Sequence, residues 1–500
     1  MSTTKTLLLA IDLGTSFIKG AVYDLEGTCL HIVSQPVKDE RPAQGIFIQR
    51  GEDLLDSVVA CMKQLCLHIG ERAGDIEAIA FTGQMAGFMG VDKDWNDITT
   101  WSCSLDTRYI PYADRQMKEL RKEFLEISGT NAPQMAPKYE WFKNEFPAEN
   151  AKISKYLMIS GFIIGQLGDL PVEDAVIDTT FTTWTGLADI TKGEWSKSIC
   201  DAVGMDTRYL PRIVKSDSVC ARLSDRMGKE IGLKGGIPLV SGAGDKSASC
   251  VGSGVLNPGD ANFEASSYGA IHVCVEDYRA DSEEMMYDCL PSPAGGYHVT
   301  RYIPGSGITL DWYINNFARA PGQSLSDAFR SMEEKLNNVP AGCDGLSAVG
   351  LLGGNAMPLN GNIKGSWSGY SWNHKPEHFY RALIESFTYD FELTFRRIEA
   401  KYPELTLKDF AFLGGGSKSG VWAQINADAT GKTFFCVNRK DTALLGTAIL
   451  AGSAIGAVDD IQAYVQRILS KEEEYRPRPG MREVYEPFIE NYREMLKSSV

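Results

Sequence analysis

Residues 7–16 read Leu-Leu-Leu-Ala-Ile-Asp-Leu-Gly-Thr-Ser, and residues 19–24 continue Lys-Gly-Ala-Val-Tyr-Asp. A short apolar run bounded by a turn is typical of a buried strand, so this stretch predicts a β-hairpin. Its turn, Gly14-Thr15-Ser16, offers backbone N–H groups and two hydroxyls that suit a phosphate. Asp12 stands where a carboxylate can hold a Mg²⁺ ion bound to that phosphate. An ordinary hairpin with a polar turn is the alternative interpretation.

Length and composition narrow the class of protein. A chain of 500 residues is expected to form two or more domains, and its apolar content of 43% is enough for a core in each. The net charge of −15 argues against a nucleic-acid partner, because phosphate backbones favour basic surfaces.

Targeting and membrane signals are not found in the sequence. It does not begin with a basic and apolar leader, so secretion is not expected. The longest uncharged run, residues 442–458, is short for a membrane span and contains three glycines, so we interpret it as a buried core helix. We therefore expect a soluble, cytoplasmic protein without a membrane partner.

The cysteines and histidines do not form a recognisable site. The eleven cysteines are scattered without a Cys-x-x-Cys pair, which indicates reduced thiols. The six histidines show no ligand spacing, so a zinc site is not expected.

Strand-like runs alternate with helical patterns along the chain, which predicts an α/β protein. The strand candidates are residues 78–81, 238–241, 262–275 and 410–413, and the clearest helix candidates are residues 52–67 and 378–400. The second of these helices carries an apolar residue at every fourth position from Phe379 to Phe395, a stripe that suits packing in a core.

A weak internal repeat points to a duplicated fold. Residues 14–22 and residues 265–271 both show a small hydroxyl-rich turn followed by a strand. A duplication would place one phosphate hairpin in each half, with the boundary near residues 252–259. Chance similarity between two short turns is the alternative.

Two glycine-rich turns follow other strand-like runs. Residues 236–246 read Gly-Ile-Pro-Leu-Val-Ser-Gly-Ala-Gly-Asp-Lys, and Asp245 can accept a proton from a substrate hydroxyl, although an Asp in a turn is often only a turn former. Residues 413–420 read Leu-Gly-Gly-Gly-Ser-Lys-Ser-Gly, and glycines at a helix start allow a nucleotide to lie against bare backbone. A dinucleotide-binding fold is disfavoured because Ser419 replaces the last glycine of its motif.

A third loop carries groups that suit hydroxyl recognition. Residues 81–87 read Phe-Thr-Gly-Gln-Met-Ala-Gly, and Trp101, Asp106 and Arg108 follow shortly after. An ordinary polar loop with a core tryptophan is the alternative.

Together these motifs resemble the FGGY carbohydrate kinases of the actin-like, sugar-kinase and heat-shock ATPase superfamily, over nearly the whole chain. Residues 135–145 resemble the first family signature, and residues 365–369 with 378–385 resemble the second. The resemblance implies an α/β, two-domain, duplicated actin-like (ribonuclease H-like) ATPase fold with an interdomain cleft. Residues 1–252 would bind the sugar and supply the catalytic base, and residues 253–500 would bind ATP.

The resemblance also implies roles for individual residues. Asp245 is expected to be the catalytic base, and Asp12 is expected to organise Mg²⁺. The residues expected to bind the substrate are Gln84, Met85, Trp101, Asp106, Arg108 and Lys246. The residues expected to bind ATP are Gly14, Thr15, Ser16, Lys19, Ser266, Ser267, Gly307, Asp311, Gly415, Gly416 and Ser417.

The implied function is ATP-dependent phosphorylation of a hydroxyl of a small carbohydrate, and Gly83-Gln84-Met85 favours a ketopentose such as xylulose. Lys246 stands where the family commonly has Gln, and Ala86 replaces the His of xylulokinase-like loops. Another ketose, a sugar alcohol or a sugar acid is therefore the alternative, and Lys246 motivates the acid. A lysine that points to the surface is the other interpretation of Lys246.

The second phosphate turn, usually Gly-Thr-Ser-Gly, reads Ala-Ser-Ser-Tyr at residues 265–268. A non-catalytic nucleotide-binding protein of the same superfamily is the remaining alternative, and Asp245 argues against it. A homodimer is common in the resembling family.

Overall fold

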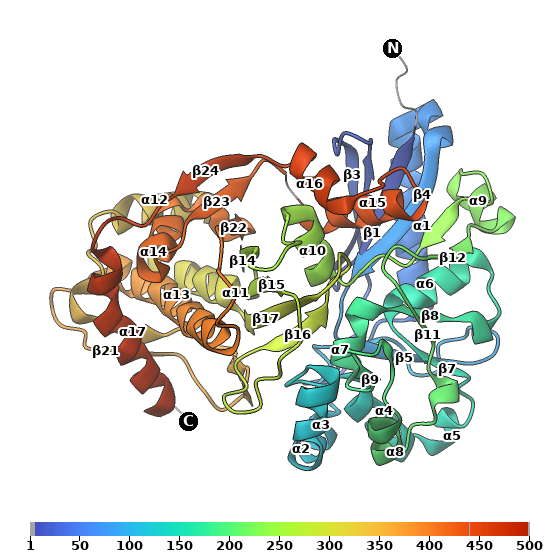
Figure 1. Ribbon diagram of the computed structural model, residues 1–500, viewed down its shortest axis with the longest axis horizontal. Coiled ribbons are helices and arrows are strands. Elements are labelled where there is room, and N and C mark those ends of the chain that lie inside the picture. The colour runs from blue at the N-terminus through green and yellow to red at the C-terminus, as the bar shows by residue number, and fades with distance from the viewer. Residues whose placement is uncertain (1–5, 440, 499–500) are drawn as a thin grey trace. The chain divides into compact units, whose positions relative to one another are not determined.

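The computed structural model describes residues 6–439 and 441–498 (Figure 1). The chain forms two compact α/β units. Unit 1 comprises Met1–Leu256, Cys289–His298 and Arg439–Leu469, and unit 2 comprises Asn257–Asp288, Val299–Asn438 and Ser470–Val500. A division of the sequence at residue 252 places residues 439–469 in the C-terminal half, whereas in the structure they belong to unit 1.

Unit 1 is built on a mixed six-stranded sheet. Its strands, in spatial order, are β12 (Val219–Arg222), β13 (Pro238–Val240), β4 (Ile76–Gly83), β1 (Leu7–Leu13), β2 (Phe17–Tyr23) and β3 (Cys29–Pro36). Strand β1 runs parallel to β4 and antiparallel to β2, and β4 runs parallel to β13. The hairpin expected from residues 7–24 is therefore present, with Asp12 directly opposite Lys19.

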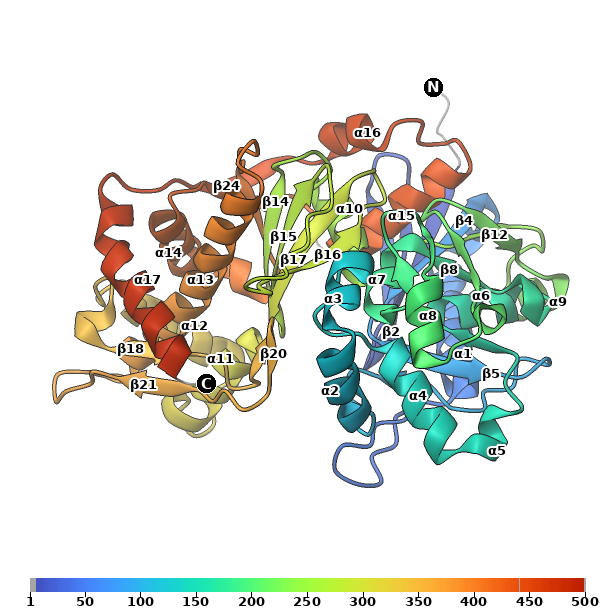
Figure 2. The ribbon, with the colours of Figure 1, turned by 60° about the horizontal axis from the view of Figure 1, so that its bottom comes forward.

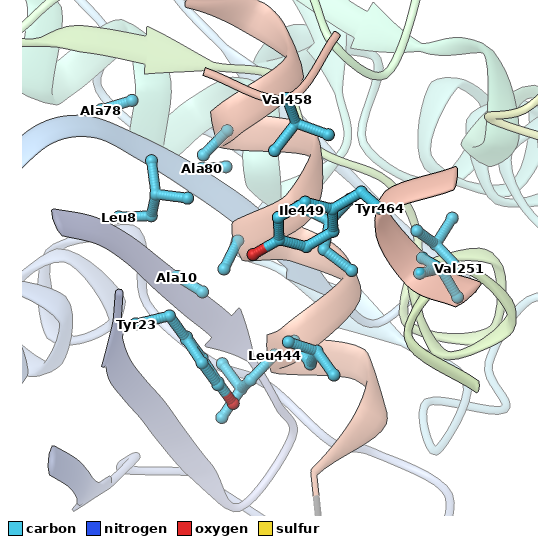
Figure 3. Close-up of a cluster of buried hydrophobic side chains, with 14 of the residues drawn as sticks. Leu8, Ala10, Tyr23, Ala78, Ala80, Val251, Leu444, Ile449, Val458 and Tyr464 are labelled. Atoms are coloured by element: carbon cyan, nitrogen blue, oxygen red, sulfur yellow. The ribbon is translucent and has the colours of Figure 1, made fainter. Parts of the chain in front are cut away.

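Helices cover both faces of this sheet, which explains why β1 is apolar along nearly its whole length. Helix α1 (Gly51–Ile69) covers one face, where Leu65 and Cys61 pack over Gly20 of β2. Helix α15 (Thr442–Ala454) covers the other face (Figure 1). Figure 3 shows the resulting core, in which Leu8 and Ala10 of β1 belong to the same buried cluster as Leu444 and Ile449 of α15.

Helix α15 is the buried core helix expected from the uncharged run of residues 442–458. It crosses α10 (Asp245–Ser253) so closely that each helix presents a glycine to the backbone of the other. A Cβ atom at Gly252 would collide with the carbonyl oxygen of Thr442, and a Cβ atom at Gly446 would collide with that of Ala248. The packing of α15 on α10 and on the sheet is the reason why residues 439–469 belong to unit 1.

The other helices of unit 1 are shorter. They are α2 (Ile110–Glu119), α3 (Arg121–Glu123), α4 (Met135–Glu145), α5 (Pro147–Asn150), α6 (Ile159–Gly168), α7 (Thr182–Thr185), α8 (Lys197–Val203), α9 (Asp225–Ile231) and α16 (Ile461–Ile468). The small strands β5 (Gly87–Val91), β6 (Ser102–Cys103), β7 (Lys155–Leu157), β8 (Val176–Asp178), β9 (Ala188–Asp189), β10 (Glu194–Trp195) and β11 (Arg212–Val214) complete it.

Unit 2 repeats the central topology. Its strands are, in spatial order, β17 (Tyr297–Ile303), β15 (Gly269–Val275), β14 (Ala261–Ala265), β22 (Phe410–Leu413), β23 (Phe434–Val437) and β24 (Lys471–Tyr475). All but the first residue of the short strand β16 (Asp288–Pro291) belong to unit 1. Strand β14 runs antiparallel to β15 and parallel to β22, as β1 does with β2 and β4. The internal repeat is thus a true structural duplication. The expected strand at residues 262–275 is a hairpin, as the repeat predicts.

Aromatic side chains form the core of unit 2 around Phe263 of β14. Its ring lies 4.7 Å from that of Phe391 on α13 (Pro376–Lys401) and 6.0 Å from that of Trp422 on α14 (Gly420–Thr430), measured between ring centroids. Figure 2 shows α13 and α14 beside α17 (Met481–Ser498). The remaining elements are α11 (Ser306–Tyr313), α12 (Leu325–Leu336), β18 (Ser347–Val349), β19 (Asn355–Ala356), β20 (Leu359–Asn360) and β21 (Ser366–Ser368). No helix in the described part of the chain is long and apolar enough to cross a membrane.

The glycine contact between α10 and α15 generates a stability prediction. Gly446→Ala is expected to lower the free energy of unfolding by about 1–3 kcal/mol, because overpacking outweighs the better helix propensity of Ala. Gly74→Ala is the control, since a Cβ atom there meets no atom within 4 Å. Urea denaturation of both variants checks the prediction, and an unchanged midpoint for Gly446→Ala would contradict it.

Candidate active site

Three loops of unit 1 meet at one edge of its sheet. They follow the neighbouring parallel strands β1, β4 and β13, and comprise Gly14–Ser16, Gln84–Ala86 and Ser241–Gly244. Ligands of open α/β sheets bind outside the carboxyl ends of the strands, where such loops converge. We call Gly14–Ser16 the phosphate turn, Gln84–Ala86 the acceptor loop and Ser241–Gly244 the base turn, after the roles that the sequence predicts for them. All three lie at the same edge of the sheet.

Asp12 lies at this edge among both acidic and basic side chains. It is opposite Lys19 in β2 and beside Thr82 in β4. The pKa of the Asp12 carboxyl is raised to about 7, mainly by burial and also by the carboxylates of Asp245 and Asp441, while Lys19 opposes the rise. A divalent cation would relieve this crowding of acidic groups, so the donor set fits Mg²⁺. No group of three or more His, Cys, Asp or Glu residues in the described chain is arranged to hold a metal, so phosphate oxygens would have to complete the coordination.

The turn that carries Asp245 is tightly packed. Gly242 has a φ of +66°, and a Cβ atom at this position would collide with the carbonyl oxygen of Phe81. A Cβ atom at Gly244 would lie 2.5 Å from the sulfur of Met85, so the base turn and the acceptor loop are in direct contact. Asp245 is the first residue of α10, where the helix dipole favours a carboxylate, and the amide of Lys246 donates to its Oδ1 at 2.7 Å.

A buried polar network supports this turn from behind. The Gly244 amide donates to Thr180 Oγ1 at 2.8 Å, and the Thr180 hydroxyl in turn donates to the Asp178 carboxylate. Asp178 also accepts from Ser216 Oγ at 2.7 Å, and burial raises the pKa of its carboxyl to about 6 against the effect of these hydrogen bonds. The sequence analysis missed this network because Asp178 and Thr180 lie far from residue 244 in the chain and carry no motif.

The acceptor loop is held by buried contacts. Trp101 has no exposed surface, and its indole Nε1 donates to Gln84 Oε1 at 3.2 Å. Asp106 is also fully buried and accepts from Ser102 Oγ at 2.9 Å and from Arg108 Nε at 2.9 Å. The Asp106 carboxylate thus fixes the shape of the loop, and the Arg108 guanidinium lies 4.5 Å from the Trp141 ring centroid.

Lys138 is the second support of this loop. Its ammonium has no exposed surface and donates to the carbonyl oxygens of Ser102 at 2.8 Å and Cys103 at 2.6 Å. It also lies 4.7 Å from the Tyr109 ring centroid. Burial lowers the pKa of Lys138 to about 8. The residue lies in the stretch 135–145 that the sequence analysis quoted, but no role was expected for it.

Unit 2 gathers the second set of predicted residues around the β14–β15 turn. The amide of Gly307, near the start of α11, donates to the Ser266 carbonyl at 3.1 Å. Gly414 has a φ of +83° and approaches the Ala265 carbonyl so closely that a Cβ atom would lie 2.6 Å from its oxygen. A Cβ atom at Gly415 would meet no atom within 4 Å, so this backbone is open to a ligand. The predicted residues that this region brings together are Ser266, Ser267, Gly307, Gly415, Gly416 and Ser417. Asp311 lies farther along α11 and is exposed.

Glu264 is a charged residue of this turn that the sequence analysis did not select. It pairs with Ala270 in the second hairpin, the register position that Asp12 holds in the first. Its Oε1 accepts from Ser266 Oγ at 2.8 Å. The duplication is the signal that could have revealed it, once the two hairpins are aligned by strand register.

Comparison with protein-family models identifies the chain. The N-terminal domain of the FGGY family of carbohydrate kinases matches residues 7–252, and the C-terminal domain of that family matches residues 284–455. This chain belongs to the FGGY family of carbohydrate kinases. It is accordingly an ATP-dependent carbohydrate kinase, as the sequence motifs indicated.

Relatives of this kinase carry different substrate names. It is 25% identical to an autoinducer-2 kinase of Klebsiella pneumoniae over 97% of this chain and 92% of the relative. It is 22% identical to a xylulose kinase of Bacillus subtilis over 97% of this chain and 96% of the relative. A crystal structure of gluconate kinase from Lactobacillus acidophilus superposes with a TM-score of 0.89 at 22% identity, covering 99% of this chain and 98% of that one, which confirms the expected fold.

The buried ammonium of Lys138 predicts a pH dependence of the stability of this kinase. Its pKa falls from an ordinary 10.5 to about 8 in the folded state, so the unfolded chain binds more protons between these pH values. Stability from this residue therefore rises with pH from about 8 to 10.5, and each pKa unit corresponds to about 1.4 kcal/mol.

Lys138→Met removes this contribution, so the stability of wild type relative to the variant should rise by about 2–3 kcal/mol from pH 7.5 to 10. Chemical denaturation at several pH values measures the difference. Lys143→Met, on the same helix but partly exposed, is the control variant. A pH-independent difference for Lys138→Met would contradict the prediction.

Proposed function

We propose that this kinase transfers the γ-phosphoryl group of ATP to a hydroxyl of a small ketose, with Asp245 as the base. The observation that carries the proposal is the meeting of Asp12, Lys19 and the Asp245 turn with the Gln84–Met85 loop at one sheet edge of unit 1. Asp245 takes the proton of the hydroxyl as its oxygen bonds to the γ-phosphorus. The bond from that phosphorus to the β–γ bridging oxygen breaks, and ADP leaves with the electron pair.

Two hydroxyl-bearing turns are assigned to the phosphates, one in each half of the duplication. Thr15, Ser16 and Lys19 serve the first, and the Lys19 ammonium offsets negative charge on the phosphoryl group. Ser266, Ser267 and the backbone of Gly307 and Gly415 serve the second. Mg²⁺ would be held by Asp12 together with phosphate oxygens and would offset their charge. Such positioning and charge stabilisation account for most of the catalysis of phosphoryl transfer.

The acceptor is assigned to the ketopentoses, with xylulose as the first candidate. The Gln84–Met85 loop and the name of the Bacillus subtilis relative support this assignment. Another ketose, a sugar alcohol or a sugar acid is the second candidate class, supported by Lys246 beside the base and by the gluconate kinase of similar fold. A non-catalytic nucleotide-binding role is disfavoured because the carboxylate of Asp245 lies close enough to Asp12 to raise the pKa of the Asp12 carboxyl.

Removal of the base tests the mechanism. Asp245→Asn is expected to lower kcat by about 10²–10⁴-fold while ATP binding is retained, because the amide cannot accept the proton. Coupled ADP release, measured with ketoses, polyols and aldonates, follows turnover, and calorimetry follows ATP binding. Asp225→Asn is a matched control at the first residue of α9. Near wild-type turnover by Asp245→Asn would rule out the assignment.

Lys246 distinguishes the two substrate classes. A neutral ketopentose makes no ion pair, so Lys246→Gln should change kcat/KM for xylulose by less than about tenfold, the effect of 1.4 kcal/mol. Steady-state kinetics with xylulose and with an aldonate make the comparison. If wild type turns over the aldonate and the variant selectively loses that activity, the substrate class is reassigned to sugar acids.

A further inference from the structure

A ring of hydrogen bonds in unit 1 joins the phosphate turn to the acceptor loop, and Gln49 closes it. Gln49 lies just before α1 and is only 1% exposed. Its side-chain Nε2 donates to the carbonyl oxygen of Thr15 at 2.8 Å. The sequence analysis assigned no role to this residue.

The rest of the ring runs through Trp101 and Gln84. The backbones of Gln49 and Trp101 exchange two hydrogen bonds, of 3.3 Å and 2.8 Å. The Trp101 indole donates to the side-chain Oε1 of Gln84 at 3.2 Å. The backbone N–H of Gln84 donates to the Leu13 carbonyl oxygen at 3.2 Å. Leu13 ends β1 directly before the phosphate turn, so the ring returns to its start.

The partners in the ring fix the orientation of both side-chain amides. A carbonyl oxygen only accepts, so the NH₂ end of Gln49 must face Thr15, and an indole N–H only donates, so the oxygen of Gln84 must face Trp101. The two remaining ends are buried and have no hydrogen-bond partner among the described residues, namely Oε1 of Gln49 and Nε2 of Gln84. An unpaired buried polar atom costs about 1–3 kcal/mol. The ring thus keeps one acceptor and one donor whose pairing would stabilise it, and a hydroxyl can serve either.

We propose that Gln49 is a positioning residue that couples binding of the sugar to the setting of the Thr15 phosphate turn. The inference rests on the proposed function, because the coupling needs a polyhydroxy acceptor beside Gln84. A sugar hydroxyl that pairs with the side-chain amide of Gln84 stabilises the ring. Gln49 extends this stabilisation to the backbone of the phosphate turn, because its side chain donates to the Thr15 carbonyl oxygen. Sugar and ATP then strengthen the binding of each other by the same factor.

The test separates coupling from simple stability. Gln49→Met keeps the size of the side chain but removes its amide, and Gln49→Glu keeps its shape but cannot donate to Thr15. Calorimetry measures the dissociation constant of xylulose with and without a non-hydrolysable ATP analogue, and coupled ADP release gives kcat. We expect at least about fivefold coupling in wild type. In both variants we expect the coupling factor, the ratio of the xylulose dissociation constants without and with the analogue, to fall close to one. We also expect kcat to fall by about tenfold or more. Gln64→Met, an exposed position of α1, is the control.

Other outcomes would overturn the inference. One such outcome is that both Gln49 variants keep the coupling factor of wild type and a kcat within twofold of the wild-type value. Another is a uniform loss of stability and of both affinities with an unchanged coupling factor, which would leave Gln49 a purely structural residue. If Gln49→Met does not fold, the coupling factor and kcat of Gln49→Glu alone decide whether the inference holds. A wild-type protein with no sugar-dependent ADP release from the whole sugar panel would instead overturn the proposed function, and this inference with it.

Discussion

The candidate active site depends on the parallel pairing of β1 with β4 and of β4 with β13. This pairing places Asp12 beside Thr82 and Leu13 beside Gly83, so the neighbouring strands β1 and β4 end side by side at the same edge of the sheet. Three loops from distant parts of the sequence thereby meet at one edge of the sheet. A shift of one residue between β1 and β4 would turn the side chain of Asp12 to the other face of the sheet. The packing of α15 on this sheet holds the register, because Leu8 and Ala10 fit the buried cluster only from one face.

The sequence predicted those parts of the fold whose information is local. The apolar run that ends at Asp12, the uncharged run that becomes α15 and the strand at residues 410–413 each carry their own pattern, and the structure has all three. The return of residues 439–469 to unit 1 was beyond prediction. It depends on Gly252 and Gly446, whose missing side chains let α10 and α15 approach, and glycines in a helical pattern do not reveal which helix they face.

The same limit applies to the candidate site. Asp12, Asp245 and Gln84 were selected because each lies at the end of a strand, or in or directly after the turn that follows one. Asp178, Lys138 and Gln49 were missed because their importance lies in what they bond to, and each has a partner that is distant in sequence: the Ser216 hydroxyl, the carbonyl oxygens of residues 102 and 103, and the Thr15 carbonyl. Buried polar residues with backbone partners leave no periodic pattern. The sequence thus sufficed to propose the reacting groups, whereas the groups that hold their loops became visible only in the structure.

The duplicated hairpins are alike in topology but differ in charge. In the first, Asp12 faces Lys19, so the turn combines a carboxylate with a cation that can approach a phosphate. In the second, the register partner of Glu264 is the apolar Ala270, and the Glu264 carboxylate accepts a hydrogen bond from the Ser266 hydroxyl. The two hairpins of the repeat therefore carry different groups at equivalent positions. Under the function proposed above, the first hairpin would supply the charged groups that face the metal ion and the transferring phosphoryl group. The second would supply backbone and hydroxyl contacts that hold the nucleotide.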